Sequence, residues 1–186
     1  MKNTLTALSL VMGAALPVWA ADSQTVAGSC EAKYQAIAAA ALKLPYWEFD
    51  QTEAGWRQLG ACPAEAAQLL ERYVAKQARE QRGVRWHLAQ TLALSGQAAR
   101  AADEAQQSID PHEDPNTTAF SWNSYVQATI AFLRNDRARF DTHYRTHQAT
   151  VDKHAGNKIN FEVLTGLKQC FGRPYKEAYE DCRPAP

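Results

Sequence analysis

Three histidines in the second half of the chain have the spacing of a metal site. His143, His147 and His154 fall within residues 137–154, which we expect to form one helix. At about 100° per residue, His147 lies roughly 40° and His154 roughly 20° around the helix from His143. Imidazoles on one helical face can hold Zn²⁺ or Cu²⁺. Three apolar residues share that side, which favours a packing face, so these histidines are candidates only and we expect no cofactor.

Four cysteines offer a second kind of chemistry. Cys30, Cys62, Cys170 and Cys182 are even in number and include no Cys-x-x-Cys pair, which favours disulfides over a metal centre. Three pairings can be drawn. The spacing favours Cys30 with Cys62 and Cys170 with Cys182, which closes short loops near the two ends. The bond between Cys170 and Cys182 is harder to form in this fold. A full second hairpin helix would carry Cys182 about 13 Å away from the turn near Gly172.

The N-terminus has the pattern of a secretory signal peptide over residues 1–20. Lys2 precedes a short apolar run, and Val18-Trp19-Ala20 supplies the small residues of a cleavage site after Ala20. The run is shorter than the about 20 residues that a membrane-spanning helix needs. We therefore expect a bacterial protein that is periplasmic or secreted and is not inserted in the membrane after cleavage.

The composition limits the fold and the partner. Lys+Arg and Asp+Glu both number 20, which disfavours a nucleic-acid-binding surface. Hydrophobic residues make up 46% and charged residues 22%, a balance typical of a globular domain. The chain is rich in alanine and leucine and poor in β-branched runs, which predicts an all-α fold.

Prolines and glycines divide residues 21–186 into helices joined by nearly evenly spaced turns. The turns fall near Cys62, Gly96, Asn135 and Gly172, at intervals of about 35, 39 and 37 residues. One hairpin of helices cannot bury both of its faces, whereas stacked hairpins share a continuous core. The spacing therefore predicts a single helical-repeat domain of stacked antiparallel hairpins, with about 8–9 helices.

The segment from Trp86 to Ala101 resembles the tetratricopeptide repeat family. Leu88, Ala89 and Leu92 match the first helix of that repeat, and Gly96 matches its turn. The best units are residues 84–110, 121–154 and 158–182. The resemblance implies a right-handed solenoid with a concave groove that binds a partner protein or peptide.

Residues on the concave groove can be assigned by position in these units. The predicted partner-binding residues are Trp86, Gln90, Trp122, Tyr125 and Thr129. Tryptophan and tyrosine are effective anchors because they bury a large, rigid area. No nucleophile, phosphate loop or paired-carboxylate motif stands out, so we expect a binding module and not an enzyme. The alternative is an envelope metal-binding protein that uses the histidine stripe.

A helix is expected over residues 31–43, ended by Pro45, and residues 46–52 are expected to form the connector that follows it. This connector is the densest aromatic cluster of the chain, with Trp56 just beyond it. It could form a shelf for a ligand. A terminal repeat also needs its apolar face covered, and we favour this capping role.

Overall fold

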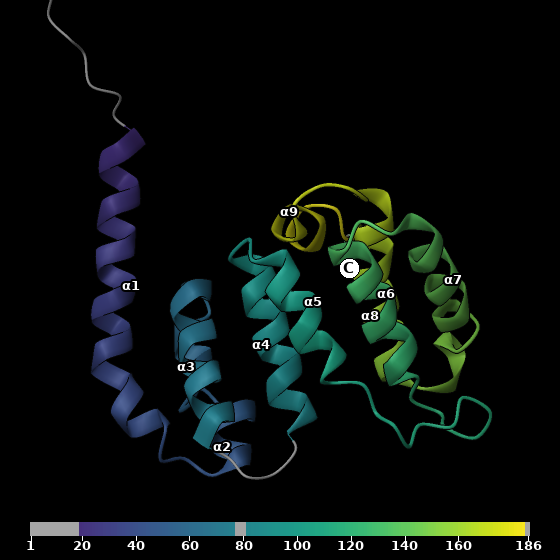
Figure 1. Cartoon of the computed structure of the whole chain (residues 1–186), viewed down its shortest axis with the longest axis horizontal. Coiled ribbons are helices and arrows are strands. Elements are labelled where there is room, and N and C mark those ends of the chain that lie inside the picture. Colours follow the sequence, from purple (N-terminus) through teal and green to yellow (C-terminus); the bar gives the residue numbers. More distant parts are fainter. Residues whose placement is uncertain (1–18, 77–80, 185–186) are drawn as a thin grey trace, which may run out of the picture.

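The computed structural model describes residues 19–76 and 81–184, with side chains from Gly28 onward within those ranges. In this part the chain is all-α, with nine α-helices, two short 3₁₀ helices and no strand (Figure 1). The elements are α1 (Trp19–Ala41), α2 (Tyr46–Gln51), η1 (Trp56–Leu59), α3 (Pro63–Lys76), α4 (Arg82–Leu94), α5 (Ala98–Gln106), α6 (Trp122–Leu133), α7 (Arg137–Gln148), η2 (Val151–Lys153), α8 (Ala155–Gln169) and α9 (Tyr175–Glu180).

Three turns between helices use the left-handed backbone conformation. The residues are Gly96 with φ 83°, Asn135 with φ 54° and Gly172 with φ 89°. At the first two turns the next amide donates to the carbonyl five residues earlier, at 2.8 Å in both cases. Glycine adopts this conformation without a Cβ clash, and asparagine tolerates it. These turns lie where the regular spacing in the sequence predicted them.

Neighbouring helices pack on one another along the chain. Contacts join α3 to α4, α4 to α5, α5 to α6 and α6 to α7, while α8 packs on α6 and α7. The last helix departs from this order, because α9 contacts both α8 and α4 (Figure 1). Large, fully buried side chains run through the whole array: Leu69, Leu70, Tyr73, Val84, Leu88, Leu92, Phe140, Leu164 and Leu167.

Both disulfides have the pairing that the spacing favoured. Cys30 is bonded to Cys62 and Cys170 to Cys182, with Cα–Cα distances of 5.6 and 6.2 Å. The second pair forms because α9 ends at Glu180 and the chain folds back. Each closed loop stabilises the fold by about 2–4 kcal/mol.

Three elements differ from those expected. The first helix begins at Trp19 and not near residue 31. Of the signal peptide predicted over residues 1–20, residues 1–18 lie outside the described part. The aromatic segment expected as a connector is helical, as α2, with Pro45 as its extended N-cap. The helix expected over residues 137–154 ends at Gln148, and a 3₁₀ turn and α8 follow.

Candidate functional site

The five predicted partner-binding residues lie together on one face of α4 and α6. The ring centroid of Trp86 is 5.2 Å from that of Trp122 and 5.0 Å from that of Tyr125. Gln90 and Thr129 border the same packed space as Trp86. We call these five residues the α4–α6 face.

The C-terminal segment of the chain covers the α4–α6 face. Tyr175, the first residue of α9, shares with Gln90 and Thr129 a space that has no room for a water molecule. Trp86, Tyr125 and Thr129 are at most 5% exposed, and the other two residues are half-buried. Burial raises the pKa of Tyr125 far above its usual value. The groove that we expected to be open is therefore filled, and the binding role of its residues stays a prediction.

A glycine in α8 allows the C-terminal segment to approach closely. A Cβ on Gly166 would lie 2.8 Å from the carbonyl oxygen of Ala178 and 3.0 Å from the amide nitrogen of Arg183. The guanidinium of Arg183 lies over the ring of Tyr179, 5.3 Å from its centroid. The segment is thus held by α8 as well as by α4 and α6.

His147 is a core residue. It is fully buried, with Nδ1 2.8 Å from the hydroxyl of Ser124 and Nε2 3.0 Å from the carbonyl oxygen of Asn157. Burial lowers its pKa, although its hydrogen bond to Asn157 acts in the opposite direction. Both ring nitrogens are engaged, so His147 links α6, α7 and α8 and has no nitrogen left for a metal.

The other two histidines of the stripe lie elsewhere. His154 is outside α7, because that helix ends six residues earlier, and its Nδ1 accepts a hydrogen bond from the amide of Gly156 as the N-cap of α8. His143 borders an open groove between α5, α6 and α7. The structure therefore does not bring the three candidate metal ligands together, and the expectation that they share one helix was wrong.

A buried carboxylate pairs with His87, an interaction that the sequence analysis did not find. Asp50 is fully buried, and its Oδ1 lies 2.6 Å from Nδ1 of His87 and 3.4 Å from Nε1 of Trp56. Burial alone would raise the pKa of Asp50, but the hydrogen bonds and the charge of His87 more than offset this and lower it. The pair joins α2 to α4 across 37 residues, a separation that leaves no spacing signal.

The aromatic segment 46–52 mainly covers the N-terminal helices. The ring of Phe49 stacks on that of Tyr73 with centroids 3.6 Å apart, and Trp56 is 9% exposed. Tyr46 and Trp47 remain 40% and 67% exposed. The inner residues of the segment thus pack on α3 and η1, and its outer residues face solvent. A capping role at the end of a solenoid stays a prediction.

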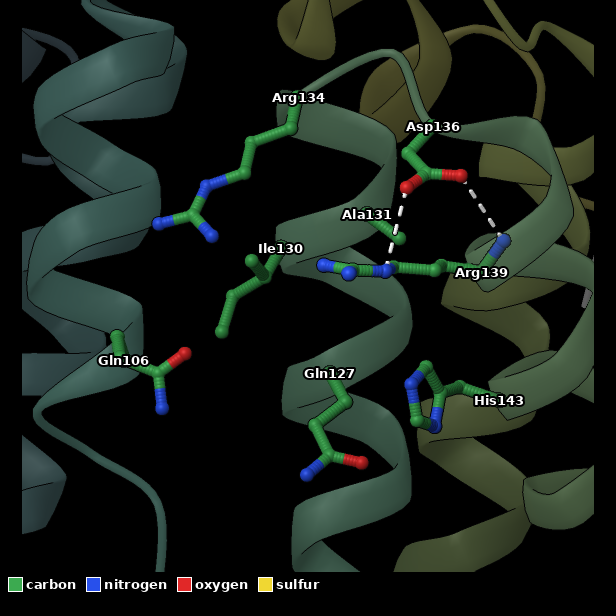
Figure 2. Close-up of a pocket in the computed structure, with 8 residues that line it drawn as sticks. All are labelled: Gln106, Gln127, Ile130, Ala131, Arg134, Asp136, Arg139 and His143. Carbon is green, nitrogen blue, oxygen red and sulfur yellow. Dashed lines mark hydrogen bonds and ion pairs between the residues drawn. The ribbon is translucent and has the colours of Figure 1, made fainter.

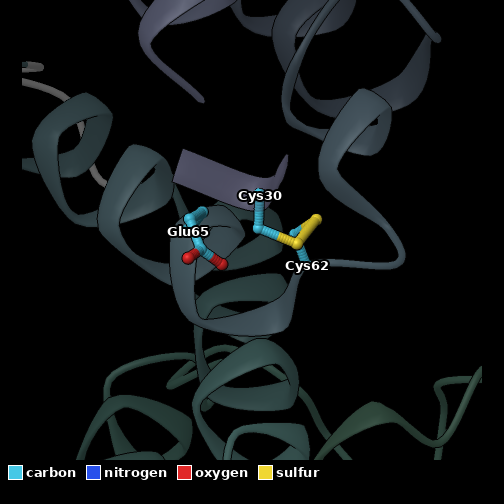
Figure 3. Close-up of side chains that lie close together, drawn as sticks. All are labelled: Cys30, Cys62 and Glu65. Atoms are coloured by element: carbon cyan, nitrogen blue, oxygen red, sulfur yellow. A yellow bond between two sulfur atoms is a disulfide. The ribbon is translucent and has the colours of Figure 1, made fainter. Parts of the chain in front are cut away.

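One cluster has metal-ligand chemistry by composition alone. Sulfur atoms of Cys30 and Cys62 and a carboxylate oxygen of Glu65 lie within 4.8 Å of one another. Figure 3 shows, however, that the two sulfurs are bonded to each other. Cysteine binds a metal ion as a thiolate. The two bonded sulfurs are not thiolates, so this cluster does not provide a set of metal ligands.

An open groove of about 240 Å³ lies between α5, α6 and α7. Figure 2 shows Gln106 on α5 facing Ile130 and Gln127 on α6, with Arg134 extended toward α5. Arg139 and His143 border it from α7. We call it the arginine groove. Its polar side chains differ from the packed aromatic chemistry of the α4–α6 face.

The arginine groove is bordered by two guanidinium groups and by the carboxylate of Asp136. Nε of Arg139 is 3.4 Å from Asp136, and Arg134 is 3.3 Å from Asp103, which lies outside the groove. Burial and the positive charge of Arg139 lower the pKa of His143, so the imidazole is neutral near pH 7. The groove can donate hydrogen bonds to an anion.

Across the described residues, no helix is both long and apolar enough to cross a membrane. No protein-family model matches the chain, and neither the curated proteins nor the solved structures include a match. Function must therefore be argued from the geometry above.

Proposed function

We propose that the protein is an exported helical-repeat module, similar to tetratricopeptide repeat proteins, that binds a helical segment of a partner protein or peptide. The observation that carries this proposal is the docked position of α9. This six-residue helix places Tyr175 and Tyr179, one turn apart, against the array, with Tyr175 on the α4–α6 face. A surface that holds one such helix within the chain has the shape to hold another in its place.

The regular turns support a repeat architecture. The left-handed residues fall at positions 96, 135 and 172, and each follows the first helix of a hairpin. Stacking of such hairpins in a right-handed solenoid would place α4, α6 and α8 along one concave surface. The proposed role is non-covalent binding of a partner, with no catalysed reaction.

The disulfides support export. Two bonds and no free cysteine among the described residues are typical of oxidising compartments such as the bacterial periplasm or the extracellular space. The charge and apolar pattern of residues 1–20 is consistent with the same route.

An open groove provides a starting point for a partner. It has a volume of about 510 Å³ and is lined by the three turn residues, among others. Ala93, Leu133 and Tyr175 border both this groove and the packed space under α9. A partner that first contacts the open groove can therefore extend onto the covered face by displacing α9.

The docked segment has one unfavourable contact. The hydroxyl of Tyr175 is buried beside the Gln90 side chain, and no hydrogen bond of ordinary geometry satisfies it among the described residues. An unpaired buried hydroxyl costs about 1–3 kcal/mol. A partner with phenylalanine at this position would bind more tightly than the chain's own segment.

The test is binding of a labelled peptide of residues 173–184, with Cys182 replaced by serine, followed by fluorescence anisotropy. We expect saturable binding to the full-length Cys170→Ser/Cys182→Ser protein and at least about tenfold weaker binding to the wild type, whose disulfide holds the competing segment in place. A Tyr175→Phe peptide should bind about tenfold more tightly still.

Two controls make the result decisive. Circular dichroism must show that the double variant retains its helices, and a peptide with both tyrosines replaced by serine should not bind. If neither the peptide of residues 173–184 nor its Tyr175→Phe form binds a folded double variant, the α4–α6 face is only a core surface and the proposed function is wrong.

A further inference from the structure

The arginine groove is a second surface with its own recognition chemistry. It shares no lining residue with the packed space under α9 or with the open groove at the turns. Its base is apolar, at Ile130 and Ala131, and polar side chains rise around it from three helices (Figure 2). An inference about this groove therefore stands apart from the proposed function.

Both guanidinium groups are held by exposed ion pairs. The side chain of Arg134 is 44% exposed and that of its partner Asp103 is 78% exposed. The side chain of Arg139 is 74% exposed, and Asp136 beside it is 39% exposed. Exposed pairs stabilise weakly. A carboxylate from a ligand can therefore replace Asp103 at Arg134 and form a charge-assisted hydrogen bond there.

Asp136 limits how the groove can use its charge. Its Oδ1 accepts the amide of Arg139 at 3.0 Å as the N-cap of α7, and its Oδ2 faces Nε of the same residue. The carboxylate is thus occupied by one residue of its own helix. The outer edge of the Arg139 guanidinium can therefore face a ligand, and so can Arg134 once the ligand has displaced Asp103.

Two amide side chains stand on opposite walls of the groove. Gln106 comes from α5 and Gln127 from α6, and Figure 2 shows both directed into the space between the helices. An amide carries both a donor and an acceptor, so it can pair with a peptide group in either direction. A volume of about 240 Å³ is smaller than the roughly 300–1,000 Å³ of pockets that enclose a small ligand. The groove therefore suits a few side chains of a larger partner.

We propose that the arginine groove binds an acidic peptide segment of a partner protein. Carboxylates of the segment contact Arg134 and Arg139, its main chain pairs with Gln106 and Gln127, and its aliphatic groups rest on Ile130. His143, at the end of the groove, senses the added negative charge.

The probe is an acetylated hexapeptide in which glutamate alternates with alanine, titrated into the full-length protein at low ionic strength. Calorimetry should detect binding, and proton NMR should show a rise in the pKa of His143, because a nearby carboxylate favours the imidazolium. Arg139→Ala should weaken binding about tenfold. The matched control is Arg145→Ala, an exposed arginine of α7 that does not line the groove, and it should leave binding unchanged.

Other ligands decide the class of partner. Inorganic phosphate at equal concentration should bind more weakly than the peptide, and a hexapeptide with glutamine in place of glutamate should not bind. Equal binding of the glutamine peptide, binding of phosphate alone, or an unchanged His143 titration would each overturn the proposal. If Arg139→Ala does not fold, Arg134→Gln provides the same test from the C-cap of α6.

Discussion

Replacing Asp50 with asparagine tests the contribution of a fully buried carboxylate that pairs with His87. The carboxylate is fully buried and accepts hydrogen bonds from His87, Trp56 and Gln51. An asparagine has nearly the same shape, but it loses the charge and directs an amide NH₂ group at donors. A hydrogen bond to a charged group contributes about 1.5–3 kcal/mol. We expect Asp50→Asn to lower the free energy of unfolding by about 2–3 kcal/mol near pH 7.

The pH dependence of this loss follows from the direction of the pKa shift. The pKa of Asp50 is lower in the fold than its ordinary value. Such a group stabilises the fold above the unfolded-state pKa of about 4, and the contribution is lost as the pH falls through the folded-state pKa. The difference in stability between wild type and Asp50→Asn should therefore be full at neutral pH and should narrow below about pH 4.

Urea unfolding followed by circular dichroism at several pH values measures both effects. For a domain of this size the loss corresponds to a melting temperature lower by about 5–10 °C. The control is Asp103→Asn, which removes an ion pair whose carboxylate side chain is 78% exposed and should change stability by less than about 1 kcal/mol. Equal effects of the two variants, or a difference independent of pH, would refute the assignment of Asp50 as a buried, charged partner of His87.

Three further sets of substitutions test which residues stabilise the fold. Gly96→Ala should cost about 1 kcal/mol in urea unfolding because its φ is 83°, whereas Gly28→Ala, in the open on α1, should stabilise slightly. His147→Ala should lower stability by about 2–4 kcal/mol, and excess Zn²⁺ should leave the wild-type melting temperature unchanged, since both ring nitrogens are hydrogen-bonded. Cys30→Ser/Cys62→Ser should cost about 2–4 kcal/mol, and a melting temperature equal to that of wild type would contradict this.

Local patterns in the sequence predicted the helices and their turns because these depend on short-range chemistry. Glycine or asparagine at each left-handed turn and proline at helix starts can be recognised without any tertiary contact. The pairing of the cysteines follows from short separations along the chain for a similar reason. The regular spacing of the turns was the main basis for the correct prediction of the helices and of the turns between them.

The interactions that the sequence did not predict are long-range. Asp50 and His87 come from helices whose relative placement no local pattern specifies. The early end of α7 at Gln148 depends on Asn157, whose side-chain nitrogen donates to the carbonyl oxygen of Thr150 at 2.8 Å and so holds the turn that follows the helix. A helical period can be read from residue types, but the residue at which the helix stops is set here by contacts from α8.

The position of α9 explains why the five residues of the α4–α6 face lie together and yet form no open groove. The residues of the α4–α6 face were assigned by position from the resemblance to tetratricopeptide repeats, and they lie together in the structure. Whether that face is open depends on the path of residues 173–184. Gly166 admits the backbone of Ala178 at close range, and the bond between Cys170 and Cys182 holds the segment beside α8. A close approach at a glycine such as Gly166, on a helix beside a predicted binding face, therefore allows the chain's own C-terminal segment to cover that face.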